Sequence, residues 1–278
     1  MAENLLPKLS TARSLNQIFH ALAAVQTPAI IWHSRGGERI ELSGRVLMNW
    51  VDKSANLLLN ECEVEEGSTL HIESDVHWRC VALCLAALRA GALLNSNEPQ
   101  VGVALDAATA ARFTRSPDFL LLIDRGPLAM RYTGDSEAVF SVYDGEILDF
   151  CALVRSEADQ FMGMPPHPTT EVLAGVTNAD VLAEILKQAR SFDSHQVRLD
   201  SGEPALAVLL NSQHSFGTPE NALAIVCEVL GALVAGYAVL ITDPTAGFTP
   251  AEIAPILASE RAVDTRRQGT SLLQVKQQ

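Results

Sequence analysis

The feature that most constrains the fold is a helix–turn–strand unit that occurs twice. The first copy ends at Ala87-Leu88-Arg89-Ala90-Gly91 and the second at Ala232-Leu233-Val234-Ala235-Gly236, an offset of 145 residues (232 − 87). In both copies an apolar helix precedes the motif and a short apolar strand follows it. A small residue in the last turn and a left-handed glycine let the strand begin directly beneath its helix. The matching flanks favour an internal duplication over a chance match in an alanine-rich chain.

Strands and helices alternate along most of the chain. The pattern predicts strands at 28–32, 38–42, 68–73, 92–95, 119–123, 205–210 and 237–242, with short β segments in 126–150. It predicts helices at 11–25, 43–59, 76–90, 103–114, 178–190, 219–235 and 250–259. Such alternation is typical of parallel sheets with right-handed crossovers. We therefore expect an α/β fold of two similar layered lobes, each a mostly parallel sheet flanked by helices. The first lobe is residues 1–155, with an N-terminal hairpin, and the second is residues 156–278, with a polar C-terminal tail.

Composition excludes several classes of partner. The formal net charge is −13, which repels nucleic acids and anionic membrane surfaces. Residues 221–241 are apolar enough to suggest a membrane span, but Glu228 in the middle and the Gly236-Tyr237 turn favour a buried helix and strand. The N-terminus lacks a signal-peptide pattern, so we expect a cytoplasmic protein. Hydrophobic residues make up 48% of the chain, enough to cover a dimer interface as well as a core, so a homo-oligomer stays open.

Two regions carry a more specific resemblance. Thr27-Pro-Ala-Ile-Ile, Ser54-Ala-Asn-Leu-Leu, Glu66-Gly-Ser-Thr-Leu-His-Ile and Ala86-Ala-Leu-Arg-Ala-Gly-Ala-Leu-Leu follow one another before Pro99, and Leu209-Leu-Asn-Ser-Gln-His-Ser-Phe-Gly217 comes later. In order and spacing these segments resemble the AMP-forming adenylating enzymes, the superfamily of acyl-CoA synthetases, nonribosomal peptide adenylation domains and luciferases. The resemblance covers about residues 25–125 and 204–264.

The resemblance implies a cleft between the lobes for ATP, AMP or CoA. It also implies that His214 lines the channel between the nucleotide and acyl sites, and that Phe216 and Gly217 shape the same pocket. These three residues are the candidate binding residues. The alternative interpretation of His214 is structural: a histidine at the end of a strand whose ring is hydrogen-bonded to a loop carbonyl.

The departures from the family pattern bear on catalysis. The family has a Ser/Thr/Gly-rich loop that ends in Pro-Lys-Gly and holds the ATP phosphates. The corresponding residues, 165–204, offer only Pro168-Thr-Thr-Glu171, and Lys187 falls inside a predicted helix. The family's later half, with its ribose-binding acidic residue, Thr-Gly-Asp segment and adenylation lysine, has no counterpart before Gln278, and Lys276 is no replacement.

We therefore expect a truncated relative, equivalent to the N-terminal portion, that binds a small molecule or a protein partner without catalysis. No residue is assigned a catalytic role. The alternative is an adenylate-forming, acyl-CoA ligase-like enzyme that acts on a carboxylic acid once another chain completes its site.

Two polar constellations remain. Cys80 and Cys84 lie one turn apart on a predicted helix, but their apolar neighbours favour a core position, so no metal site is predicted. Four polar residues follow one predicted strand toward its carboxyl end: His71, Glu73, Asp75 and His77. Ligands of parallel sheets bind at that edge, whereas the simpler interpretation is a capped helix start.

Overall fold

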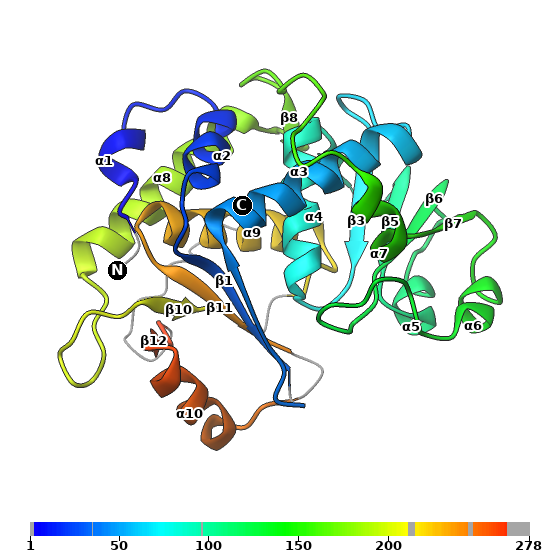
Figure 1. Cartoon of the computed structure of the whole chain (residues 1–278). Helices are drawn as coiled ribbons and strands as arrows, with labels where there is room; N and C mark the ends of the chain where they lie inside the picture. Colours follow the sequence, from blue (N-terminus) through cyan, green and yellow to red (C-terminus); the bar gives the residue numbers. More distant parts are fainter. Residues whose placement is uncertain (1–2, 35, 96, 211–214, 244–246, 266–278) are drawn as a thin grey trace.

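The computed structural model describes residues 3–34, 36–95, 97–210, 215–243 and 247–265. Its elements form successive layers (Figure 1): helix α10, a first sheet, a group of central helices, a second sheet, and the short helices α5 and α6. The predicted α/β fold of mostly parallel sheets flanked by helices is therefore confirmed.

The first sheet has the strand order β12-β10-β11-β1-β2. Its strands are β1 (Pro28–His33), β2 (Arg39–Ser43), β10 (Ala207–Leu209), β11 (Ala238–Thr242) and β12 (Ala262–Val263). β1 pairs in parallel with β11 and antiparallel with β2. The N-terminal hairpin therefore extends the sheet built by the second half of the chain.

The second sheet has the strand order β4-β3-β5-β6-β7, and all of its pairs are parallel. Its strands are β3 (Thr69–Glu73), β4 (Leu93–Leu94), β5 (Val101–Ala104), β6 (Phe119–Leu122) and β7 (Glu146–Asp149). A separate hairpin joins β8 (Glu171–Leu173) to β9 (Val176–Thr177).

The longer helices gather between the two sheets, with α10 on the far face of the first (Figure 1). The helices between the sheets are α2 (Leu15–Ala23), α3 (Gly44–Glu61), α4 (Trp78–Ala90), α8 (Asn178–His195) and α9 (Pro219–Val234). Helix α10 is Pro250–Ser259. The short helices are α1 (Leu6–Leu9), α5 (Ala107–Ala110), α6 (Ser136–Phe140) and α7 (Phe150–Leu153), with a 3-10 turn at Val154–Ser156.

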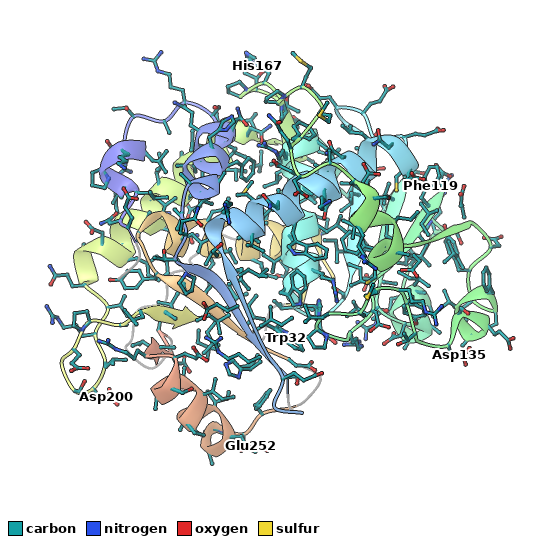
Figure 2. All side chains as sticks on the ribbon, viewed as in Figure 1. Trp32, Phe119, Asp135, His167, Asp200 and Glu252 are labelled. Atoms are coloured by element: carbon teal, nitrogen blue, oxygen red, sulfur yellow. The ribbon has the colours of Figure 1, made fainter. Side chains whose placement is uncertain are left out.

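One apolar core fills the space between the sheets. Strand residues alternate between the two faces of each sheet, so Ile30 and Trp32 face this core while Ile31 joins a smaller cluster beneath α10. In the second sheet Val103 faces the central core, and Ala104 faces a cluster that includes Val139 just before the end of α6. Figure 2 shows side chains filling the layer between the sheets, with Trp32 near the carboxyl end of β1.

The repeated unit has the same backbone geometry in both copies. Gly91 and Gly236 have φ angles of 80° and 88°. The N–H of the residue after each glycine donates to a carbonyl five residues earlier, Ala92 to Ala87 and Tyr237 to Ala232, both at 2.9 Å. The left-handed glycine thus turns each helix directly into its strand, as the motif predicts.

Three expectations need correction. Residues 103–114 do not form one helix, because Val101–Ala104 is a buried strand of the second sheet and only Ala107–Ala110 is helical. Within 126–150, Ser136–Phe140 is a helix, where an isolated β segment was expected. The N-terminal hairpin lies in the same sheet as β10 and β11, not in the sheet of β3 to β7. The boundary near residue 155 stays a prediction.

Residues 221–241 fold as the end of a buried helix and a strand. Among the described residues, no helix combines the length and apolarity needed to cross a bilayer.

Substitution of the repeat glycine should destabilise the protein. Gly91→Ala places a side chain in the left-handed region, and its Cβ would lie 3.3 Å from Glu66 Cγ and from Pro166 Cβ. Gly37 has a similar φ of 85° with nothing within 4 Å of its Cβ position. We expect urea denaturation to show a loss of about 1 kcal/mol for Gly37→Ala and of about 2 kcal/mol for Gly91→Ala. Equal losses would show that the close approach to Glu66 and Pro166 is unimportant.

The partly buried carboxylate of Glu260, the residue after α10, contacts the hairpin. Glu260 Oε1 lies 2.7 Å from His33 Nε2 and accepts from Arg39 Nε at 2.8 Å. The hydrogen bond from Arg39 is the main cause that lowers the pKa of Glu260 below its ordinary 4.5.

Because the folded-state pKa of Glu260 is lowered, its contribution to stability is present above about pH 4.5 and is lost as the pH falls through the folded-state value. Glu260→Gln should therefore cost about 1 kcal/mol at neutral pH, and less at about pH 3. Denaturation midpoints at the two pH values measure this. A loss that does not change with pH would contradict the assignment.

Candidate functional site

The two sheets are joined at the carboxyl end of β3, where the segment before α9 contacts the residues after β3. The N–H of Phe216 donates to the carbonyl of Ser74 at 2.9 Å. We call residues 73–77 and 215–217 the seam. Parallel strands bind ligands at their carboxyl ends, and the seam lies at that end of β3, so it is the candidate functional site.

The three predicted binding residues have different outcomes. His214 lies outside the described residues, and its proposed role stays a prediction. Phe216 is fully buried and belongs to the central core. Gly217 is partly exposed, and a Cβ there would lie 3.7 Å from Glu73 Oε2. Phe216 and Gly217 are therefore together at the seam, with Phe216 serving as packing.

His71 and Glu73 form a pair on one face of β3. Nε2 of His71 lies 2.9 Å from Oε1 of Glu73, and both residues are buried. The ring of Phe113 meets the His71 ring edge-on, with centroids 5.7 Å apart. The alternation noted in the sequence therefore produces a carboxylate–imidazole pair at the seam.

His77 is the N-cap of α4. Its Nδ1 accepts from the N–H of Arg79 at 3.2 Å, and the ring packs against Trp32 with centroids 5.4 Å apart. Burial, followed by the charges of Arg79 and Arg125, lowers the pKa of His77 to about 3. The ring is therefore neutral at physiological pH. A capped helix start was expected at Ser74 or Asp75, and the structure places the N-cap at His77 instead.

Arg79 holds the loop that follows β6. This guanidinium is almost completely buried and stacks on the rings of Trp50 and Trp78. It donates to three carbonyls of that loop, those of Asp124 (3.2 Å), Gly126 (2.6 Å) and Ala129 (3.0 Å). A buried charge needs such partners, so Arg79 fixes the loop beside the seam.

The carboxylates along the carboxyl edge of the second sheet brace the backbone. Asp124 accepts from the N–H groups of Gly126 and Thr133, both at 2.7 Å. Burial acts to raise the pKa of Asp124, but the hydrogen bonds from Thr133 and Gly126 outweigh it and hold the pKa below its usual value. Asp106 and Asp149 cap α5 and α7 in the same way. These carboxylates are therefore bonded to backbone amides of the loop after β6 or of the first turns of α5 and α7.

The segment where a phosphate loop would be expected has a different structure. Residues 171–177 form the β8–β9 hairpin, which leads directly into α8. Thr177 and Asp180 close the N-terminus of α8 with a reciprocal capping box. Lys187 is exposed on α8 and pairs with Glu184 at 2.9 Å. The N-terminus of α8 therefore carries an acidic residue in its first turn, and Lys187 is paired with Glu184.

The cysteines of α4 are core residues. Cys80 and Cys84 are fully buried, and burial raises the pKa of the Cys80 thiol to about 12. The hydroxyl of Ser74 donates to Cys80 Sγ at 3.2 Å. In the described part of the chain, no group of three or more His, Cys, Asp or Glu side chains is arranged to hold a metal ion.

The layered α/β fold is similar to that of solved acyl-CoA synthetases, acyl-adenylate ligases and adenylation domains. The structure is similar to an acyl-CoA synthetase of Brucella canis, with a TM-score of 0.59 and 16% identity over 84% of this chain and 43% of that one. It is also similar to a fatty acyl-adenylate ligase of L. pneumophila in complex with acyl adenylate and pyrophosphate (TM-score 0.61, 13% identity, 94% of this chain and 45% of that one). An adenylation domain of a keto acid-selecting nonribosomal peptide synthetase module, bound to a keto acyl adenylate, matches with a TM-score of 0.62 and 13% identity over 90% of this chain and 47% of that one. At these identities the likeness establishes the fold.

A particular relative is known by sequence. A Mycobacterium tuberculosis protein named TIGR03089 family protein is 28% identical over 162 residues, which are 55% of this chain and 62% of that protein. No protein-family model matches the chain. The chain thus spans less than two thirds of this relative and less than half of the solved structures.

Sequence reasoning missed the arginines beside the seam. Arg79 reads as one polar position in an apolar helix, although its place between Trp78 and Cys80 could have suggested burial. Arg125 donates to Asp106 Oδ2 at 3.0 Å, and the Asp75 carboxylate lies 3.8 Å away. The spacing of these three residues in the sequence gives no sign of this contact.

Loss of the buried guanidinium should be costly. Arg79→Met keeps the apolar stem but leaves three carbonyls without their donor, so we expect a loss of about 3 kcal/mol in urea denaturation. The control is Arg115→Met, which removes an exposed arginine paired with Glu98 and should change stability by less than about 0.5 kcal/mol. Similar losses for both variants would refute the role of Arg79.

Proposed function

We propose that the protein binds a small molecule or a protein partner at the seam and does not itself catalyse adenylate formation. The fold is that of proteins whose solved structures hold acyl adenylates, which supports a ligand at the carboxyl ends of the strands. The observation that carries the non-catalytic role is the capped hairpin and helix at 171–195, which take the place of a phosphate-binding loop.

Charge supports the same proposal. Adenylate formation places the triphosphate of ATP against cations, and removal of a single stabilising donor typically costs about 10²–10³ in rate. Lys187 pairs with Glu184, and Arg125 pairs with Asp106. A net charge of −13 adds a general repulsion against a polyanion.

A second candidate function is an adenylate-forming ligase that acts on a carboxylic acid once another chain completes its site. The shared fold with acyl-CoA synthetases and acyl-adenylate ligases favours it. Under this alternative the partner chain would supply the groups that hold the phosphates.

ATP–pyrophosphate exchange separates the two candidates. We expect no exchange with a panel of carboxylic acids, either for the protein alone or with cell extract added. Exchange that requires this chain and is lost in His214→Ala would overturn the non-catalytic proposal.

A thermal-shift screen with ATP, AMP, CoA and acyl-CoAs tests small-molecule binding. A ligand at 100 times its Kd should add about 2.7 kcal/mol of stability. The shift should disappear in Gly217→Val, whose Cβ meets Glu73 and Ser215 only at ordinary contact distances, and persist in Ala254→Val on the exposed surface of α10. A shift that Gly217→Val leaves unchanged would place the ligand elsewhere.

A further inference from the structure

Glu73 is a buried carboxylate with one oxygen still available. It ends β3 with 9% of its surface exposed, and its Oε1 lies 2.9 Å from His71 Nε2. Among the described residues, the hydrogen bonds of Glu73 end at His71. Oε2 has no partner there and is not fully enclosed by protein atoms, so it can accept a hydrogen bond from an incoming N–H or O–H group.

Gly217 leaves this oxygen accessible. The position that a Cβ would take at residue 217 is 3.7 Å from Glu73 Oε2 and 3.4 Å from Ser215 Oγ. The hydrogen bond from the Phe216 N–H to the Ser74 carbonyl holds the segment at this place. Gly217 is itself partly exposed. A group that lies where a side chain of residue 217 would be is therefore next to the Glu73 carboxylate.

The charges around the seam favour a positively charged ligand group. Glu73 and Asp75 both carry carboxylates there. Both arginines beside the seam have other partners: Arg79 donates to the carbonyls of Asp124, Gly126 and Ala129, and Arg125 donates to Asp106 at 3.0 Å and lies 3.8 Å from Asp75. A phosphate or carboxylate would meet like charges, whereas an ammonium group would meet a carboxylate in a partly dehydrated setting, where charge-assisted hydrogen bonds are strong.

We propose that the seam recognises its ligand through a protonated amine that donates to Glu73 Oε2 past Gly217. This inference rests on the proposed function and names the chemical class of the ligand. In this proposal Glu73 makes the binding contact, and His71 orients the Glu73 carboxylate. Gly217, which has no side chain, leaves room for the amine.

Matched four-carbon probes test the class. We would titrate the protein with n-butylamine, 1-butanol and butyrate, and follow the backbone amide signals of Glu73, Ser215 and Gly217 by NMR. Butylamine should give saturable shifts at these residues, with an affinity at least about tenfold higher than that of butanol, and butyrate should give none.

Variants test the residues. Glu73→Gln keeps the shape of the side chain and should weaken butylamine binding about tenfold or more, while Glu65→Gln, on an exposed loop, should leave it unchanged. Gly217→Val retains the carboxylate and should also block binding. If Glu73→Gln fails to fold, Gly217→Val still decides. Butylamine binding that both variants leave intact would overturn the proposal.

The outcomes separate this inference from the proposed function. Binding of butyrate or of a nucleotide at Gly217, without binding of butylamine, would overturn the amine class and keep the seam as a binding site. Absence of shifts with these probes and with ATP, AMP, CoA and acyl-CoAs would overturn both the amine class and the small-molecule role.

Discussion

The structure depends on the complete burial of α4. Every residue from Trp78 to Ala90 is buried, including an arginine near each end. Arg89 Nε lies 2.6 Å from Asp52 Oδ1 of α3, and its Nη1 donates to Asn16 Oδ1 of α2 at 3.0 Å. Phe19 and Phe161 cover the Arg89 guanidinium. Arg79 holds the loop after β6. A central helix that buries two charges is stable only if those partners are in place, so α4 fixes α2, α3 and the second sheet relative to one another.

This constraint also builds the seam. α4 begins directly after the residues that contact the returning segment, and its N-cap, His77, packs against Trp32 of the first sheet. Contacts from both sheets thus converge at one helix terminus. Burial lowers the pKa of His77 and also that of Arg79, yet the guanidinium retains three carbonyl acceptors. The carboxyl end of β3 is therefore rigidly placed, as a binding site requires.

Local patterns predicted much of the fold, and long-range pairing explains what they missed. Helical periodicity and the N-cap at Ser43 predicted α3, and Pro250 marked the first residue of α10. The sequence pattern assigns Val103 and Ala104 to a helix because a short apolar run fits either structure, and the position of β5 between β3 and β6 shows that they belong to a strand. The pairing of β1 with β11 joins residues more than 200 positions apart, which periodicity does not report. At the site, the family resemblance pointed to Phe216 and Gly217, whose binding role stays a prediction, whereas Arg79 and Arg125 act through contacts made only after folding.

The distribution of charge at the sheet edge bears on the kind of ligand that the seam can accept. Along this edge Asp106 and Asp149 accept from the first-turn amides of α5 and α7, and Asp124 accepts from the loop amide of Gly126, so these carboxylates stabilise the backbone. The first turn of α8 carries the carboxylate of Asp180. Oε2 of Glu73 has no hydrogen-bond partner among the described residues and lies near Gly217. These contacts are the basis of our proposal that the seam accepts a donor group rather than an anion.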